Sequence, residues 1–258
     1  MPKLPISLTV ITLNEERNLD RCLKSASVLV SEMIVVDSGS KDRTEEIARS
    51  YGAKFIYNAW PGFGAQKNFA HAQSAQPWVL NLDADEALTP EFINEIQDFF
   101  LAQDFALFSG ASMPRLSWYL GRYIRHGGWY PNRLVRLAKK EQSKWTEPHV
   151  HEALHIDGRI KEFREPILHF PFSCVDDQIH TNLKFSRLGY QTLLSRGVRF
   201  SVVTLILKTL GKFIETYLWK RGFLDGAPGF VIAVHAAHSI FMKYSYFLEA
   251  REQEERAP

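Results

Sequence analysis

Three carboxylates crowd together directly after an apolar run. Residues 80–86 read LNLDADE, so Asp83, Asp85 and Glu86 fall within four positions. Two carboxylates at positions i and i+2 can share one divalent cation, and hard cations such as Mg²⁺ or Mn²⁺ prefer oxygen ligands. A solvated acidic turn, with the carboxylates facing only water, is the competing interpretation. The stretch is therefore either a metal site or an exposed turn.

Two other polar clusters follow short β-branched runs earlier in the chain. TLNEE (12–16) ends the run SLTVITL, and DSGSKDRT (37–44) ends the run MIVVD. In the second cluster the glycine permits a tight turn and Ser40 or Asp42 can cap the next helix, so an ordinary capped loop is one interpretation. The other is ligand binding, because a strand-end carboxylate such as Asp37 can accept a hydrogen bond from a ribose hydroxyl or a base N–H. The sequence contains neither a G-x-G-x-x-G fingerprint nor a P-loop.

Expected strands and helices alternate over the first hundred residues. Such alternation predicts a parallel, doubly wound α/β sheet, in which ligands bind beyond the carboxyl ends of the strands. All three polar clusters follow expected strands, so we expect them to meet at one sheet edge and to form one site. The expected strands are 7–13, 33–37, 54–57 and 78–82, and the expected helices are 15–28, the segment between 44 and Gly52, 66–74, and a helix starting at Thr89 and Pro90.

Length and composition allow one large domain, or one domain with an appendage. The chain has 258 residues, 45% of them hydrophobic and 23% charged, which excludes a disordered protein. Two cysteines build no disulfide framework, so we expect a reducing compartment. We expect no secretory signal, and no transmembrane span, since the uncharged stretch 226–242 is shorter than the ~20 apolar residues that such a helix needs. The net charge of +2 points to no special partner, and we expect no nucleic-acid partner.

The segment from about residue 176 onward is helical, apolar and basic. Between Lys184 and Arg221 there are eight Lys or Arg residues and one acid. Apolar residues recur at helical spacing over 202–218 and again over 234–248. One interpretation is a helical hairpin that packs on the α/β domain. The other is a pair of interfacial helices lying on an anionic membrane surface, with Lys and Arg at the headgroups.

The stretch HGGWYPNRLVRL (126–137) combines a flexible glycine pair with aromatic and basic side chains. Aromatic faces such as that of Trp129 stack on sugar rings, and the guanidinium groups of Arg133 and Arg136 bind phosphate. A phosphorylated sugar acceptor or a donor diphosphate would suit this set. The alternative is a loop and strand that simply pack their aromatic side chains.

The first hundred residues also carry a family resemblance. TLNEE, VVDSGSKDRT, GFGAQKN (62–68) and NLDADE resemble, in order and spacing, the nucleotide-sugar-binding half of family 2 glycosyltransferases of the GT-A fold, over roughly residues 5–115. Such enzymes use a divalent metal, so the resemblance implies Mg²⁺ or Mn²⁺ as cofactor. It implies nucleotide-sugar binding by Thr12, Asn14, Glu15, Asp37, Lys67 and Asp83, and metal binding by Asp83 and Asp85.

The same resemblance implies the domain organisation. We expect a GT-A α/β fold, with a doubly wound, mixed and mostly parallel sheet and a C-terminal amphipathic helical appendage. Residues 1–175 would be the catalytic domain, with the nucleotide-sugar half at 5–115 and the half holding the acceptor and the catalytic base at 116–175. Residues 176–258 would be a helical, basic region that associates with membranes.

Later motifs narrow the resemblance. HGGWYPNRLVRL, KWTEPHVHEAL (144–154) and KRGFLDGAPGF (220–230) resemble the bacterial lipopolysaccharide-core β-glucosyltransferase subgroup. This implies UDP-glucose as donor, a heptose of the lipid-linked inner core as acceptor, and a peripheral position on the cytoplasmic face of the inner membrane, whose anionic surface would be a partner. Family 2 segments placed like KRGFLDGAPGF often border acceptor and donor, which makes Arg221 and Asp225 site candidates.

The motif VHEAL carries the expected catalytic base. Inverting transfer needs a group that takes the proton of the acceptor hydroxyl, and a carboxylate that faces the donor suits this role. Glu152 best matches the acid that family 2 enzymes place here, and Glu147 and Asp157 are the other candidates. In a strand, His149 and His151 would point away from the cleft that Glu152 faces, whereas a loop would remove this restriction. His151 is accordingly either a packing residue or a contact to metal or diphosphate.

Rival functions remain open from sequence. Another nucleotide sugar or a polyprenyl-phosphate acceptor would need the same motifs. A nucleotidyltransferase would also use a metal on acids, but it would release pyrophosphate. A binding module would hold a nucleotide without turnover.

Overall fold

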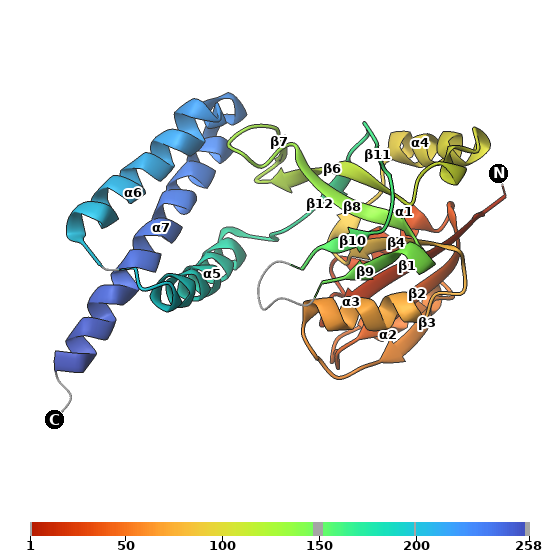
Figure 1. Cartoon of the computed structure of the whole chain (residues 1–258), viewed down its shortest axis with the longest axis horizontal. Helices are drawn as coiled ribbons and strands as arrows, with labels where there is room; N and C mark the ends of the chain where they lie inside the picture. Colours follow the sequence, from red (N-terminus) through yellow and green to blue (C-terminus); the bar gives the residue numbers. More distant parts are fainter. Residues whose placement is uncertain (1, 147–151, 199, 256–258) are drawn as a thin grey trace. The chain divides into compact units, whose positions relative to one another are not determined.

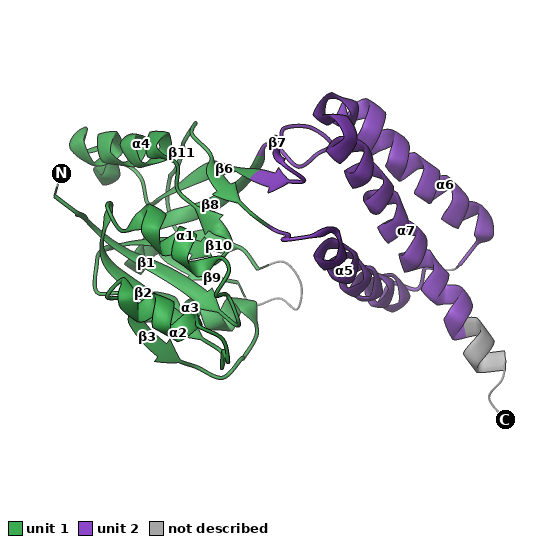
Figure 2. Ribbon diagram, turned by 180° about the vertical axis from the view of Figure 1, so that it is seen from behind, with its two compact units in different colours: residues 1–116, 132–170 green, residues 117–131, 171–258 purple. Residues whose placement is uncertain are grey.

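A computed structural model describes residues 2–146, 152–198 and 200–255 of the chain (Figure 1). The chain divides into two compact units, which Figure 2 shows in separate colours. Unit 1 comprises residues 1–116 and 132–170, and unit 2 comprises residues 117–131 and 171–258. The expected division at residue 175 therefore lies near the second boundary, but the segment 117–131 belongs with the C-terminal helices.

Unit 1 begins with the parallel half of a mixed sheet. The order β3-β2-β1-β4 runs through neighbouring parallel strands. The strands are β1 (Leu4–Thr12), β2 (Val30–Asp37), β3 (Lys54–Tyr57) and β4 (Trp78–Asp83), and the helices between them and after them are α1 (Leu19–Ala26), α2 (Thr44–Ser50), α3 (Phe63–Ala72) and α4 (Pro90–Leu101). The predicted alternation of strands and helices is confirmed.

Side-chain alternation along the strands explains the two covered faces of this sheet. In β2, Val35 joins the large core cluster with residues of α1, α2 and α4, whereas Ile34 and Val36 pack with Ala70 of α3 on the opposite face. Apolar residues on both sides of a strand are expected where helices cover both faces. The sheet is doubly wound for this reason.

Helix α4 starts where the sequence predicts. Thr89 is the N-cap, and its Oγ1 accepts a hydrogen bond from the N–H of Phe92 at 3.0 Å, while Pro90 occupies the first turn. Phe92, Ile96 and Phe99 are buried, so the expected apolar face of this helix packs into the core.

Mostly antiparallel strands complete the sheet of unit 1, and β11 is parallel to its neighbour β6. Strand β8 pairs with β4 on one side and β6 on the other, and the sheet continues through β12 to β5. A separate two-stranded ribbon of β9 and β10 packs Trp145, Leu154 and Ile156 against Ala138. The strands are β5 (Glu86–Ala87), β6 (Gly110–Tyr119), β8 (Asn132–Lys139), β9 (Ser143–Trp145), β10 (Leu154–Ile156), β11 (Ile160–Glu162) and β12 (Ile167–His169). The mixed α/β sheet of the expected fold class is confirmed.

Unit 2 is mainly helical, as the sequence predicts. It contains β7 (Arg122–Ile124), α5 (Val175–Ser195), α6 (Val202–Ile214) and α7 (Gly226–Glu255). Buried Tyr119, Ile124 and Ile232 form a small core with Trp129 and Phe172. Among the described residues, no helix is both long enough and apolar enough to cross a bilayer.

Candidate active site

The polar clusters predicted from sequence do meet at one edge of the sheet. Thr12 at the end of β1 is the direct neighbour of Asp37 at the end of β2, and Ile11 of β1 is the neighbour of Asp83 at the end of β4. The ends of three parallel strands therefore carry these residues side by side.

Asp37 organises the loop that follows its strand. Its Oδ1 accepts hydrogen bonds from the N–H groups of Gly39 (2.8 Å) and Ser40 (2.7 Å), and its Oδ2 accepts from the hydroxyls of Thr12 (2.9 Å) and Ser40 (2.5 Å). Gly39 has a φ of +106°, a conformation that favours glycine. The expected tight turn is present, and Asp37 would have to exchange one of these four donors to hold a nucleotide.

Hydrogen bonds join the loop after β1 to the loop after β2. The N–H of Asn14 donates to Ser40 Oγ at 2.7 Å, and Asn14 Oδ1 accepts from the N–H of Lys41 at 2.9 Å. Asp42 stabilises the start of α2 by accepting from the N–H of Thr44 at 3.0 Å. The N-cap of α2 is nevertheless Arg43, so Asp42 supports the helix start from the residue before the cap. Together the two loops form one rim.

Negative charge accumulates beside this rim. Burial raises the pKa of Glu15, a hydrogen bond from Asn18 opposes the rise, and the charges of Asp85, Asp42 and Asp83 add to it. A cation bound at this edge would relieve the repulsion.

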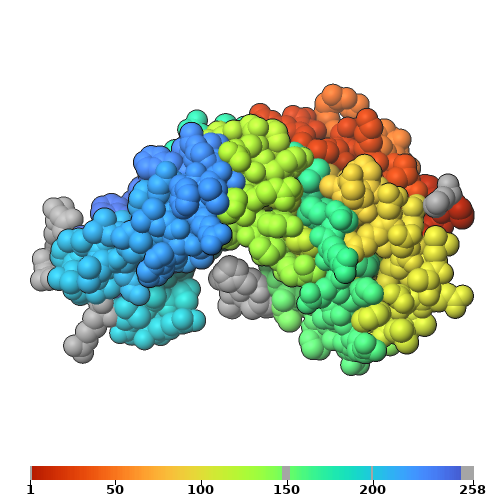
Figure 3. All heavy atoms as spheres, turned by 90° about the horizontal axis from the view of Figure 1, so that it is seen from above, coloured from red at the N-terminus to blue at the C-terminus, as the bar shows by residue number. Residues whose placement is uncertain are grey.

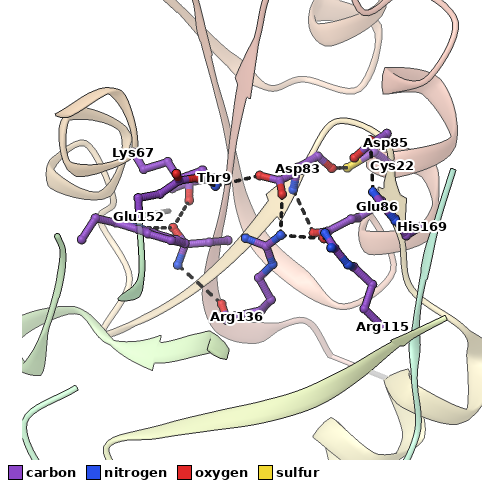
Figure 4. Close-up of polar contacts among 12 residues, drawn as sticks. Thr9, Cys22, Lys67, Asp83, Asp85, Glu86, Arg115, Arg136, Glu152 and His169 are labelled. Carbon is purple, nitrogen blue, oxygen red and sulfur yellow. Dashed lines mark hydrogen bonds and ion pairs between the residues drawn. The ribbon is translucent and has the colours of Figure 1, made fainter. Parts of the chain in front are cut away.

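Asp83 is held between two cationic side chains (Figure 4). Lys67 Nζ lies 2.9 Å from its Oδ1, and Arg136 Nη2 lies 2.5 Å from its Oδ2. Burial alone would raise the pKa of the Asp83 carboxyl, but Arg136 and Lys67 hold it well below its ordinary value. Both carboxylate oxygens are thus neutralised by the protein itself, which leaves Asp83 a poor metal ligand in this arrangement.

Glu86, the third acid of the crowded stretch, is structural. Its side chain is fully buried, and its Oε1 lies 2.6 Å from Arg136 Nη2 and 3.2 Å from Arg115 Nη1. Its Oε2 accepts a hydrogen bond from the N–H of Asp83 at 3.0 Å. A buried carboxylate with two guanidinium partners locks the turn that presents Asp83 and Asp85.

Asp85 has a different neighbour from Asp83. His169 Nε2 lies 3.4 Å from its Oδ2 (Figure 4). The pairing of β12 with β5, in which His169 is the neighbour of Glu86, brings the imidazole to this place. Sequence analysis missed His169, because the 83 residues between Asp85 and His169 leave no local pattern to read.

Lys67 links Glu152 to Asp83 at the end of β4. Lys67 Nζ donates to Glu152 Oε1 at 3.1 Å and also lies 4.5 Å from the centre of the Trp145 ring. Asn68 fixes Trp145 from the helix side, since its side-chain amide exchanges two 2.9 Å hydrogen bonds with the Trp145 backbone. Helix α3 therefore places Lys67 and anchors the ribbon that leads toward Glu152.

Two cavities share the side chains of Lys67, Asp83 and Glu152. One has a volume of about 330 Å³ and the other about 260 Å³. The first is also lined by Arg115, Arg133, Arg136 and Trp145, and the second by Glu15, Phe63, Asp85 and His169. The Glu152 carboxylate, the Lys67 ammonium and the Asp85–His169 pair thus line one cavity, the second of the two.

Comparison with known proteins decides the family. The family model described as "Glycosyl transferase family 2" matches residues 7–155 of the chain. The chain belongs to glycosyltransferase family 2. Over 97% of its length this glycosyltransferase is 31% identical to the lipopolysaccharide core biosynthesis glycosyltransferase LpsC of Rhizobium meliloti, 96% of which is covered. It is 28% identical to an uncharacterized glycosyltransferase of Rickettsia typhi, over 95% of this chain and 87% of that one.

Solved structures are more distant from this glycosyltransferase. A complex of glucosyl-3-phosphoglycerate synthase from Mycobacterium tuberculosis with Mn²⁺, UDP and glucosyl-3-phosphoglycerate is 19% identical, with a TM-score of 0.49, and the match covers 76% of this chain and 81% of that chain. A crystal structure of S. aureus TarS is 14% identical, with a TM-score of 0.46, over 97% of this chain and 92% of that chain.

The arginines expected at the acceptor of the glycosyltransferase have structural partners. Arg133 Nη2 donates to the carbonyls of Phe163 (2.7 Å) and Ser112 (3.2 Å), and Arg136 is buried between Asp83 and Glu86. Both line the larger cavity. Arg136 Nη2 is shared by two carboxylates, and the hypothesis that Arg136 also binds acceptor or diphosphate stays a prediction.

Three other acceptor candidates lie in unit 2 and line neither cavity. Trp129 packs between Tyr119 and Phe172, with ring centres 5.6 and 6.4 Å away. Arg221 is exposed. Asp225 is buried and accepts hydrogen bonds from the backbone N–H groups of two residues beyond β7, at 3.1 and 2.7 Å. Asp225 therefore has a structural role, because it holds the chain that follows β7, and its expected place beside a substrate stays a prediction.

Some expected residues of the enzyme lie outside the described part of the chain. Glu147, His149 and His151 fall within 147–151, so the strand-or-loop alternative for the two histidines stays open. Asp157, an alternative base, is exposed and is not among the residues that line the two cavities.

The donor set at the edge fits a divalent cation. Asp85 supplies a carboxylate and His169 an imidazole, with His169 Nε2 3.4 Å from Asp85 Oδ2. Nearby, burial and acidic neighbours raise the pKa of the Glu15 carboxyl. Mn²⁺ accepts both ligand types, and Mg²⁺ favours the oxygen ligand. Among the described residues no group of three or more His, Cys, Asp or Glu side chains is placed to hold a metal, so donor phosphates and water would have to complete the coordination.

Replacing Arg136 tests the structural role of this ion-pair cluster. Arg136→Met leaves the fully buried Glu86 with Arg115 alone and removes one partner of Asp83, so we expect the free energy of unfolding to fall by about 3 kcal/mol. Arg49→Met, which breaks an exposed pair with Glu45, should cost less than about 1 kcal/mol. Urea unfolding followed by circular dichroism measures both values, and equal losses would contradict a structural role for Arg136.

Proposed function

We propose that this family 2 enzyme is an inverting hexosyltransferase that moves glucose from UDP-glucose to a heptose of the lipopolysaccharide inner core. We place it at the cytoplasmic face of the bacterial inner membrane. The full-length likeness to a protein named as a lipopolysaccharide core glycosyltransferase supports the acceptor class. The choice of glucose and heptose rests on the subgroup likeness of the motifs HGGWYPNRLVRL, KWTEPHVHEAL and KRGFLDGAPGF.

One observation carries the proposal: Glu152 faces the same cavity as the Asp85–His169 pair. In our proposal, Asp85 and His169 hold Mg²⁺ or Mn²⁺, which neutralises negative charge on the departing nucleoside diphosphate when it is bound. Lys67 lines the same cavity and, in our proposal, donates to the phosphates. The Lys67 ammonium already bridges the carboxylates of Asp83 and Glu152, which hold it in place. An incoming diphosphate would compete with these two carboxylates for it.

Glu152 takes the proton of the acceptor hydroxyl. The hydroxyl oxygen then forms the new bond to the anomeric carbon, while the bond from that carbon to the diphosphate breaks and its electron pair leaves with UDP. Because attack and departure occur on opposite sides, the anomeric configuration inverts. The hydrogen bond from Lys67 orients the Glu152 carboxylate for this role.

Product analysis with a panel of donors tests the proposal. Purified enzyme with Mn²⁺ would be given UDP-glucose, other nucleotide sugars, and as acceptors truncated lipopolysaccharide or polyprenyl phosphate. We expect UDP release and a new β-glucosidic bond on lipopolysaccharide. Transfer only to polyprenyl phosphate, release of pyrophosphate, or nucleotide binding without turnover would each overturn the proposal in favour of a named rival.

A further inference from the structure

Helix α6 carries apolar residues on two faces. Phe213 packs against Phe230 of α7, with ring centres 5.9 Å apart, so one face is covered. On another face Val203, Leu207 and Leu210 are 64%, 65% and 58% exposed. Their spacing of four and three residues places them in one stripe of the helix. These three side chains are exposed next to the described residues of unit 2.

The exposed apolar surface continues beyond α6. Leu218, Trp219, Phe223 and Leu224 follow at the turn toward α7, and Trp219 is 79% exposed. We call these four residues, with Val202, Val203, Ile206, Leu207, Leu210 and Ile214, the α6 face. Figure 3 shows one side of the molecule, on which blue atoms of α6 and α7 lie at the surface. Single exposed apolar residues are common, but ten of them within residues 202–224 mark an interaction surface.

The charges around the α6 face are almost all positive. Residues 202–224 contain four Lys or Arg and a single acid, Glu215. Glu215 is paired with Lys212 at 3.1 Å and with Lys220 at 2.5 Å. Lys208 and Arg221 are exposed. The face is therefore apolar with a cationic border.

We infer that the α6 face binds the surface of an anionic lipid bilayer. Apolar side chains enter the boundary between headgroups and acyl chains, Trp219 lies at the interface, and Lys208 and Arg221 reach lipid phosphates. A second copy of the chain fits less well, because a symmetric contact would bring two cationic borders together. Because a lipid-linked acceptor belongs to the proposed function, the purpose of this contact rests on that proposal, whereas the α6 face itself does not.

Vesicle flotation of the full chain tests this binding. We expect the protein to float with vesicles of phosphatidylethanolamine and phosphatidylglycerol, and much less with pure phosphatidylcholine. Leu207→Glu should lower the partition by about tenfold or more, since burying one leucine contributes ~1.5–3 kcal/mol. The matched control is Leu101→Glu in α4 of unit 1, where the leucine is 72% exposed, and it should float like the native protein.

Several outcomes would overturn the inference. Equal losses in Leu207→Glu and Leu101→Glu would mean that the α6 face is not the contact. A native protein that ignores anionic vesicles, but sediments as a dimer that Leu207→Glu dissociates, would assign the face to a second copy. Mn²⁺-dependent UDP binding, measured on the same samples, separates the two proposals. If UDP binding persists while flotation fails, only the membrane contact is wrong. If the native protein does not bind UDP, the proposed function is wrong.

Discussion

Asp85→Ala is expected to abolish the metal-dependent part of UDP binding and to lower kcat/KM for sugar transfer by about 10²–10³-fold. The reason lies in the different surroundings of the two aspartates. Asp83 is neutralised by Lys67 and Arg136, whereas Asp85 faces His169 at 3.4 Å and lines the cavity that Glu152 also lines. Calorimetric titration of UDP with and without Mn²⁺ measures the first effect, and initial rates measure the second.

Two further variants sharpen this test of the metal site. His169→Ala should weaken Mn²⁺-dependent UDP binding in the same sense as Asp85→Ala, because the two side chains share one place at the sheet edge. Asp157→Asn is the matched control, since Asp157 is exposed and outside the cavity linings, and it should bind UDP normally. Unchanged Mn²⁺-linked affinity in Asp85→Ala would remove Asp85 from the metal site.

Glu152→Gln is expected to lower kcat by about 10²–10⁴-fold while donor binding changes little. Glutamine has nearly the same shape as glutamate, and its side-chain oxygen can still accept the hydrogen bond from Lys67, which spans 3.1 Å in the native protein. What it loses is the ability to take a proton from the acceptor hydroxyl. Single-turnover transfer measures the chemical step, and UDP-glucose titration measures donor binding.

A neutral replacement elsewhere controls for the lost charge. Glu141→Gln removes an exposed carboxylate that lines neither of the two cavities, and its activity should match the native enzyme. If Glu152→Gln retains most of its transfer activity, the base lies elsewhere, and Glu147 or Asp157 becomes the next candidate.

Much of unit 1 follows from short-range pattern. The apolar runs ending at Thr12, Asp37 and Asp83 are strands because their side chains can be buried on both faces. The helices between these strands require them to be parallel. Parallel strands that end together bring their last residues together, so the gathering of the three polar clusters could be predicted from sequence.

The division of the chain into two compact units could not be predicted from short-range sequence pattern. The segment 117–131 begins within β6 and shows no break in composition, yet it belongs to unit 2, where Tyr119 and Ile124 share a core with Ile232. Asp225 looked like a loop acid near a substrate, but its backbone partners lie about a hundred positions earlier in the chain. Such contacts have no local signature, since they depend on how distant segments pack.

The sequence by itself determined the kinds of side chain at the sheet edge and the elements that carry them there. The tertiary structure decided what each carboxylate does. Within the seven residues LNLDADE, Asp83 is neutralised by Lys67 and Arg136, Asp85 faces His169, and Glu86 is buried against two guanidinium groups. These partners come from α3, β6, β8 and β12. The chemistry of a carboxylate depends on the charges within a few ångströms of it, and only the folded chain sets those distances.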